Sequence, residues 1–104
     1  HNNAGSWKSS GSMTLYYPGG SGFTGKDFAA IVQKELVEGL GTKDLGIISR
    51  PHLAVLRKTR MPAVIAEVAY MTNSSELNRL KSADFKQAAA EALKEAVIKA
   101  LISK

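Results

Sequence analysis

An apolar run in the second half of the chain decides the fold: Met61-Pro62-Ala63-Val64-Ile65-Ala66-Glu67-Val68-Ala69-Tyr70-Met71. Valine, isoleucine and alanine dominate the run, and Pro62 stands at its entrance, where a strand tolerates proline. A near-continuous apolar strand is typical of a sheet that helices cover on both faces. The run therefore predicts a buried strand of an α/β sheet, with a neighbouring strand on each side.

Upstream of this run, the sequence predicts a strand and then a helix. Met13, Leu15 and Tyr17 alternate with polar or aromatic residues, which indicates a strand of about six residues that ends at Pro18-Gly19-Gly20. Thr24 followed three residues later by Asp27 has the pattern of a capping box. Apolar residues then recur at helical spacing until Gly41, which predicts a helix over 25–40. These apolar residues are Phe28, Ile31, Val32, Leu36 and Leu40.

After a polar loop, residues 53–56 are a candidate for a short strand. Asn73 and Glu76 predict a short helix to about Leu80, and a long helix is expected from Ser82 onwards. One apolar stripe follows this long helix, made of Phe85, Ala88, Ala89, Ala92, Leu93, Ala96, Val97, Ala100 and Leu101. The order of elements indicates a single α/β domain that lacks part of its sheet, because three strands leave at least one edge open.

Composition excludes several classes of protein. The chain has 104 residues, of which 44% are hydrophobic and 22% charged, as in ordinary globular domains. It has no cysteine, which excludes disulfide scaffolds, thiolate zinc sites and cysteine nucleophiles. No apolar stretch approaches the roughly 18 residues that cross a bilayer, and no secretory leader opens the chain. We therefore expect no membrane span.

The net charge of +5 is concentrated in one segment. Residues 43–60 carry +4, because their five cations face only Asp44. Such a patch suits an anionic polymer, whether nucleic acid, a wall polymer or an acidic peptide, and is equally typical of a solvated loop. The patch has no interleaved aromatic residues and no recognised nucleic-acid module, so nucleic acid is not expected as a partner.

Glu67 is the most informative single residue, because it interrupts the apolar run. An unpaired carboxylate costs several kcal/mol to bury, so the strand has to compensate it. Two structural explanations are a salt bridge to a buried arginine such as Arg57 and a strand end that reaches solvent. The functional explanation is a carboxylate of raised pKa in a cleft at the carboxyl end of the strand, as a general base requires.

Two histidines are the remaining candidates for chemistry. His1 precedes two asparagines, a setting in which amides could orient a metal ligand, although a lone loop histidine is more often polar surface. His52 follows Pro51 in the basic segment. Two histidines cannot supply three zinc ligands without carboxylates or residues outside this chain. A copper site built from the His1 amine, its imidazole and His52 is a further, weaker alternative.

Five short sequence motifs, taken in their order and spacing, resemble those of a known family. They are His1-Asn2-Asn3-Ala4, Gly11-Ser12-Met13-Thr14-Leu15-Tyr16-Tyr17, Leu53-Ala54-Val55-Leu56-Arg57, Met61-Pro62-Ala63-Val64 and Glu67-Val68-Ala69-Tyr70-Met71-Thr72-Asn73. Together they resemble the C-terminal half of the zinc-dependent N-acetylmuramoyl-L-alanine amidases of the amidase-3 type. The resemblance runs over nearly all of residues 1–104, which makes the chain similar to the C-terminal portion of one catalytic domain.

The resemblance implies a three-layer αβα domain with a mainly buried sheet and one zinc ion. His1 matches the second zinc histidine of the family and Glu67 its catalytic glutamate. Arg57 belongs to a motif that the resemblance implies to line the substrate groove. Asn3 is implied to orient the loop around the metal histidine. The implied reaction is hydrolysis of the amide between N-acetylmuramic acid and L-alanine in peptidoglycan, outside the cell or in the wall or periplasm.

The sequence also departs from the family. The first zinc histidine and the zinc glutamate of the family precede the position of His1, as do its first strands and helix, so the resemblance implies an upstream half as partner. Leu45-Gly46 stands where Arg-Gly is common, and Ala69-Tyr70 where Gly-Phe is usual. The alternative to a working hydrolase is a non-catalytic module that binds or regulates the cell wall.

Overall fold

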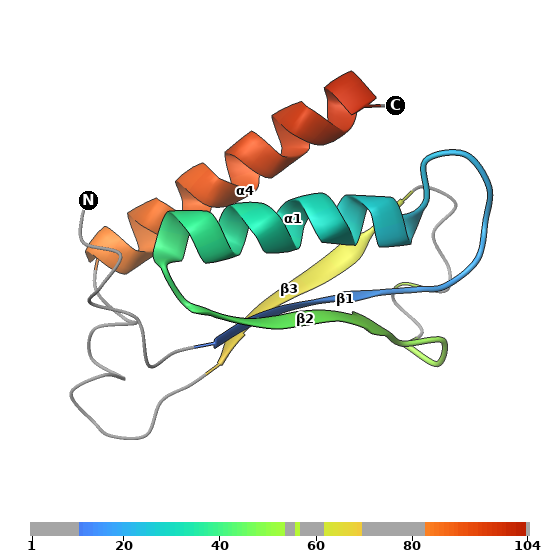
Figure 1. Ribbon diagram of the computed structural model, residues 1–104, viewed down its shortest axis with the longest axis horizontal. Helices are drawn as coiled ribbons and strands as arrows, with labels where there is room; N and C mark the ends of the chain where they lie inside the picture. Colours follow the sequence, from blue (N-terminus) through green and yellow to red (C-terminus); the bar gives the residue numbers. More distant parts are fainter. Residues whose placement is uncertain (1–10, 54–55, 57–61, 70–82, 104) are drawn as a thin grey trace.

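The computed structural model describes residues 11–53, 56, 62–69 and 83–103. Its elements are the strand β1 (Gly11–Tyr16), the helix α1 (Gly25–Leu40), the strands β2 (Lys43–Ser49) and β3 (Val64–Ala69), and the helix α4 (Ala83–Ser103). The expected helix over 73–80 lies outside the described residues. Both described helices lie on the same side of the sheet (Figure 1). The α/β class expected from the sequence is confirmed.

The central strand of the sheet is β1, in the order β2-β1-β3. It pairs in parallel with β2, to which α1 connects it, and antiparallel with β3. Thr14 stands opposite Ile47 on one side and Ala66 on the other. The predicted strands at Met13–Tyr17 and in the Met61–Met71 run are therefore present, with bounds shifted by a few residues.

The second strand lies elsewhere than predicted. Residues 43–49, expected to belong to a polar loop, form β2, whereas Leu53 is irregular and Leu56 lies in a helical turn with its N–H donating to the Leu53 carbonyl at 3.1 Å. The β2 segment begins Lys-Asp and contains Gly46 at φ +86°, so it lacks the alternation of a strand. Its pairing with β1 outweighs its weak local propensity.

The helix α1 matches its prediction, including both ends. Thr24 caps it: the Asp27 N–H donates to Thr24 Oγ1, and the Thr24 N–H donates to Asp27 Oδ2 at 2.9 Å. The donation from the Thr24 backbone holds the pKa of Asp27 below its usual value, with the Thr24 hydroxyl adding to the effect. At the other end Gly41 adopts the left-handed conformation at φ +68°, which favours glycine.

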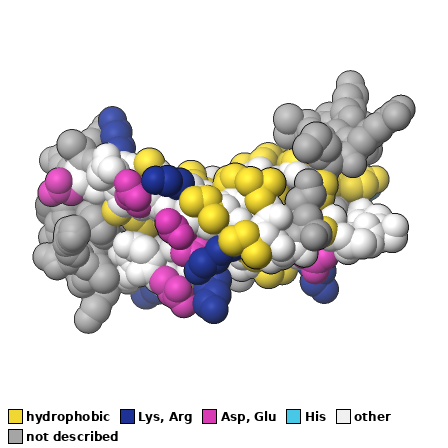
Figure 2. Space-filling view, turned by 90° about the horizontal axis from the view of Figure 1, so that it is seen from above, with side chains coloured by type: hydrophobic (Ala, Val, Ile, Leu, Met, Phe, Trp, Pro, Cys, Tyr) yellow, Lys and Arg dark blue, Asp and Glu magenta, His cyan; other side chains and the backbone are white. Residues whose placement is uncertain are grey.

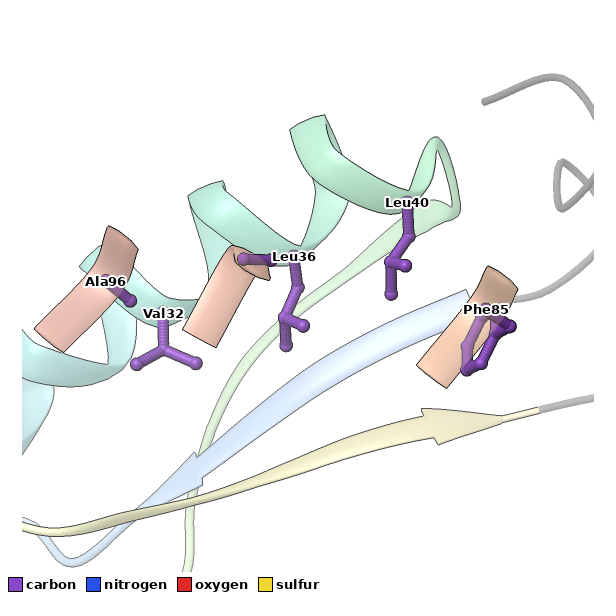
Figure 3. Packing of buried hydrophobic residues seen from close by; sticks show 6 residues of the cluster. Val32, Leu36, Leu40, Phe85 and Ala96 are labelled. Carbon is purple, nitrogen blue, oxygen red and sulfur yellow. The ribbon is translucent and has the colours of Figure 1, made fainter. Parts of the chain in front are cut away.

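The core lies where α1 packs against the sheet and α4. Figure 3 shows Val32, Leu36 and Leu40 on α1, with Phe85 and Ala96 contributed by α4. Small residues allow the two helices to approach closely, because a Cβ atom on Gly39 would lie 3.1 Å from that of Ala92. An ion pair between Lys99 Nζ and Glu35 Oε2 at 2.5 Å joins the same helices and raises the pKa of Lys99.

The single apolar stripe predicted for the last helix is divided in the structure. Phe85, Ala92, Ala96 and Ala100 are buried, as expected. Leu93, Val97 and Leu101, assigned to the same stripe, are 39%, 47% and 64% exposed. The contact with α1 is narrower than the stripe, which leaves one apolar flank of α4 without a partner among the described residues.

We expect Leu36→Ala to destabilise the domain by about 2–5 kcal/mol, because Leu36 is only 2% exposed and the substitution opens a cavity between α1 and the sheet. Urea unfolding followed by circular dichroism measures the loss. Ile102→Ala is the control, since that side chain is 79% exposed. Equal losses for the two variants would contradict the packing described above.

Candidate functional site

The sheet has one face that neither described helix covers (Figure 1). The hydroxyls of Ser12 and Thr14 point toward α1, so the alternate residues of β1 belong to the opposite face. The register then places neighbours from the other strands on that opposite face. We call this surface the far face, and it includes Met13, Leu15, Ile48, Ile65 and Glu67, with Lys43 at its end opposite Gly11.

Glu67 is the only carboxylate that the register of the described strands places on the far face. It pairs with Met13 of β1 and lies two residues before the end of β3. Its side chain is exposed, and it makes no hydrogen bond or ion pair with any described residue. Of the explanations considered for Glu67, a strand that reaches solvent agrees with the described residues, because β3 is an outer strand of the described sheet.

The same position corrects the expectation that β3 is buried on both sides. Ala66 and Glu67 are both exposed, and no described strand pairs with the outer edge of β3. Glu67 lies in the carboxyl half of the strand, where the sequence predicts it. The other predicted site residues, His1, Asn3 and Arg57, lie outside the described residues, as do Lys58 and Arg60 of the basic segment.

Behind the far face, a buried polar network connects α1 to the sheet. Its hub is Gln33, which is 4% exposed. Thr14 Oγ1 donates to Gln33 Oε1 at 3.0 Å, and Gln33 Nε2 donates to the Ser12 carbonyl and to Asp44 Oδ1, both at 2.7 Å. Ser12 Oγ and Thr42 Oγ1 share a further hydrogen bond at 2.6 Å. The network holds β1 on the side opposite Glu67.

These network residues were not predicted from the sequence, because they are polar and no motif marks them. The available signal was spacing, since Gln33 precedes Leu36 by three residues and Leu40 by seven, which places all three on one face of α1. Asp44 is held by a second contact, because its Oδ1 accepts the Gly46 N–H at 2.8 Å. The helix α1 thus contacts the sheet through hydrogen bonds as well as through apolar packing.

A cavity of about 300 Å³ lies at the other end of the sheet from Glu67. The glycine-rich loop after β1 lines it, together with Tyr17, Phe23 and Leu56. Pro62 and Ala63, just before β3, complete the lining. Since Glu67 is not among the lining residues, this cavity is not the cleft expected for the carboxylate.

The described residues lack both a cluster of metal ligands and a helix able to cross a membrane. They contain no group of three histidine, aspartate or glutamate side chains that could hold a metal ion. Within the same part, neither helix combines the length and the apolar content that a bilayer crossing requires.

Comparison with known proteins gives a family match. The model of the N-acetylmuramoyl-L-alanine amidase family, amidase-3, matches residues 1–99. The chain is similar to the N-acetylmuramoyl-L-alanine amidase LytC of Bacillus subtilis, with 33% identity over 88 residues. These residues make up 85% of this chain and 18% of LytC.

Two solved structures agree with the family match. An N-acetylmuramoyl-L-alanine amidase from Clostridium difficile superimposes with a TM-score of 0.80 at 27% identity, over 94% of this chain and 52% of that structure. The catalytic domain of CwlV from Paenibacillus polymyxa gives 0.76 at 31% identity, over 92% and 51%. The chain therefore spans about half the length of these structures.

We expect Gln33→Leu to destabilise the domain by about 1–3 kcal/mol for each buried group that it leaves without a hydrogen bond, the Thr14 hydroxyl first among them. Thr14→Val in the same background should recover part of the loss, because both partners of that bond are then apolar. A double-mutant cycle by urea unfolding measures this coupling. Strictly additive losses would show that the Thr14–Gln33 bond contributes nothing.

Proposed function

Because the chain belongs to the amidase-3 family of N-acetylmuramoyl-L-alanine amidases, we propose that it is the C-terminal portion of one peptidoglycan-hydrolysing domain. The reaction is cleavage of the amide between N-acetylmuramic acid and L-alanine. The observation that carries the proposal is the family match over nearly the whole chain. The carboxylate of Glu67, which is exposed on the far face and bound to no described residue, supports it from the structure.

In this proposal Glu67 is the general base. Its side chain is exposed and bound to no described residue, so its oxygens are available to a water molecule and a substrate at the far face. A Glu67 oxygen accepts a proton from the water that attacks the amide carbonyl. The same oxygen then donates that proton to the leaving amine, which would otherwise depart as an unstable anion.

The remaining residues of the proposal hold the site together. His1 supplies one zinc ligand, and the upstream half supplies the others, in keeping with the lack of a ligand cluster among the described residues. When bound, zinc lowers the pKa of water and polarises the carbonyl. Asn3 orients the loop that carries His1, and Arg57 contacts the substrate. The substrate places the protein outside the cell, or in the wall or periplasm.

A second candidate function is a non-catalytic module that binds peptidoglycan or regulates a wall enzyme. The observation that favours it is that the described half holds no set of three metal ligands. The two functions differ in their response to chelation. Binding to purified peptidoglycan without hydrolysis, unchanged by EDTA, supports the module.

We expect Glu67→Gln to lower hydrolysis of muramyl peptides by about 10²–10⁴-fold, because an amide cannot accept the proton from water. The assay uses the protein that joins this chain to its upstream half, loaded with zinc, and measures release of L-alanine peptides by chromatography. Glu38→Gln is the control, an exposed carboxylate on α1 rather than on the far face. Full activity of Glu67→Gln would remove Glu67 from the mechanism.

We expect His1→Ala in the same protein to reduce the zinc content from one ion per chain to well below one, because a three-ligand site loses one of its donors. Elemental mass spectrometry after dialysis measures the metal. His52→Ala is the matched control and should keep its zinc. If His52→Ala lost the metal and His1→Ala kept it, the assignment of the ligand would be wrong.

A further inference from the structure

The end of the sheet that carries Glu67 also carries a basic residue. Lys43, Gly11 and Ala69 stand opposite one another in the register of β2, β1 and β3. They form one row across the sheet, at the end where β1 and β2 begin and β3 finishes. Lys43 is also the first cation of the basic segment over 43–60, whose partner the proposed mechanism does not explain.

Lys43 lies on the same face of the sheet as Glu67. The next residue, Asp44, points toward α1, because its Oδ1 accepts a hydrogen bond from Gln33 Nε2 at 2.7 Å. Successive side chains of a strand point to opposite faces, so Lys43 belongs to the far face. Neighbouring strands are about 4.8 Å apart, and two residues along a strand span about 6.8 Å. The Cα atoms of Lys43 and Glu67 are therefore separated by about 12 Å.

The surface between these two charges is apolar. Gly11 has no side chain, and Leu45 occupies the space that one would need, because a Cβ atom on Gly11 would lie 2.5 Å from Leu45 Cδ1. Met13 pairs with Glu67 in the register of β1 and β3. A substrate chain can thus lie across β1, from Glu67 to Lys43, without meeting another charged side chain of the described strands.

The backbone that carries Lys43 is held in a fixed position. The register of β2 against β1 shifts directly after Asp44, where Gly46 is at φ +86°. The Gly46 N–H donates to Asp44 Oδ1 at 2.8 Å, and the same oxygen accepts the bond from the buried Gln33. Such a bulge redirects the side chains beside it, and the polar network behind the sheet keeps this one in place.

Lys43 differs from the cations on the helix side of the molecule. On that side, basic and acidic side chains lie next to one another (Figure 2), and Lys99 forms an ion pair with Glu35. The Lys43 side chain is exposed and makes no hydrogen bond or ion pair with any described residue. An exposed cation that no neighbour neutralises attracts an anionic group of a ligand.

We propose that Lys43 is a substrate-binding residue that selects stem peptides with a carboxylate on the second residue beyond the cut amide, L-alanine being the first. The inference rests on the proposed function, in which Glu67 acts at that amide. The lysine side chain covers part of the separation of about 12 Å, and an extended peptide advances about 3.3 Å per residue. The second residue therefore comes within reach of the ammonium group, while the first lies beside Glu67.

The test compares two muramyl peptides that differ in one group. The residue after L-alanine is glutamate in one peptide and glutamine in the other. The protein joins this chain to its upstream half and is loaded with zinc. Lys43→Gln should lower kcat/KM for the glutamyl peptide by about three- to fivefold, the range of an exposed ion pair, and leave the glutaminyl peptide unchanged. The loss should appear in KM rather than in kcat, because Lys43 binds the substrate away from the reacting atoms.

Two further variants separate a specific contact from a change in net charge. Lys43→Glu should reverse the preference, so that the glutaminyl peptide becomes the better substrate. Arg50→Gln is the matched control, because Arg50 is an exposed cation directly after the other end of β2. It should leave the ratio of the two kcat/KM values unchanged.

Binding measurements separate this inference from the proposed activity. Calorimetry in the Glu67→Gln background needs no hydrolysis, and there Lys43→Gln should weaken the glutamyl peptide alone. If the wild-type protein bound with this selectivity but hydrolysed neither peptide, the activity would fail while the role of Lys43 stood. Equal losses for the two peptides, the same loss in Arg50→Gln, or no binding of either peptide would overturn the role of Lys43.

Discussion

The rest of the structure depends on the hydrogen bonds of the Gln33 side chain. Gln33 lies between α1 and the sheet, where it joins the Thr14 hydroxyl, the Ser12 carbonyl and the Asp44 carboxylate. These bonds fix α1 over β1 and over the start of β2 together. Because a buried amide needs partners in particular directions, this contact determines the position of the helix more narrowly than apolar packing alone. The contact therefore fixes one face of the central strand, and the opposite face carries Met13 and Leu15.

Sequence patterns predicted correctly the elements that are stabilised by residues within their own segment. The helix over 25–40 has its own cap, apolar period and terminal glycine, and the structure reproduces its bounds. The strand β2 was missed because its cause is distant: it starts with Lys43 and Asp44 and contains Gly46, and it is held in place by parallel pairing with β1. The stripe on α4 was predicted too wide, since periodicity shows which residues share a face but not how much of that face a neighbour covers.

The candidate site was predictable in part, for a related reason. Glu67 stands out in sequence because it is a carboxylate within an apolar strand, and its pairing with Met13 places it on the far face. Its exposure was not predictable, because it depends on which strands lie beside β3. The polar support behind it, centred on Gln33, was not foreseen, since glutamine among leucines on a helix carries no motif. The residue type and its apolar neighbours in sequence thus identified Glu67, whereas its exposure depends on which strands lie beside β3.

The two outer strands of the described sheet, β2 and β3, differ in a way that affects the solubility of the chain. A regular apolar strand with an open side is the feature through which folded proteins recruit one another into aggregates. Among the described strands β3 has that feature, whereas β2 carries charges and a shifted register that oppose it. Any strand that lies against β3 thus acts as a protective cover in addition to its structural role. A cell that produced these residues without such a cover would have to keep their concentration low or shield them with a chaperone.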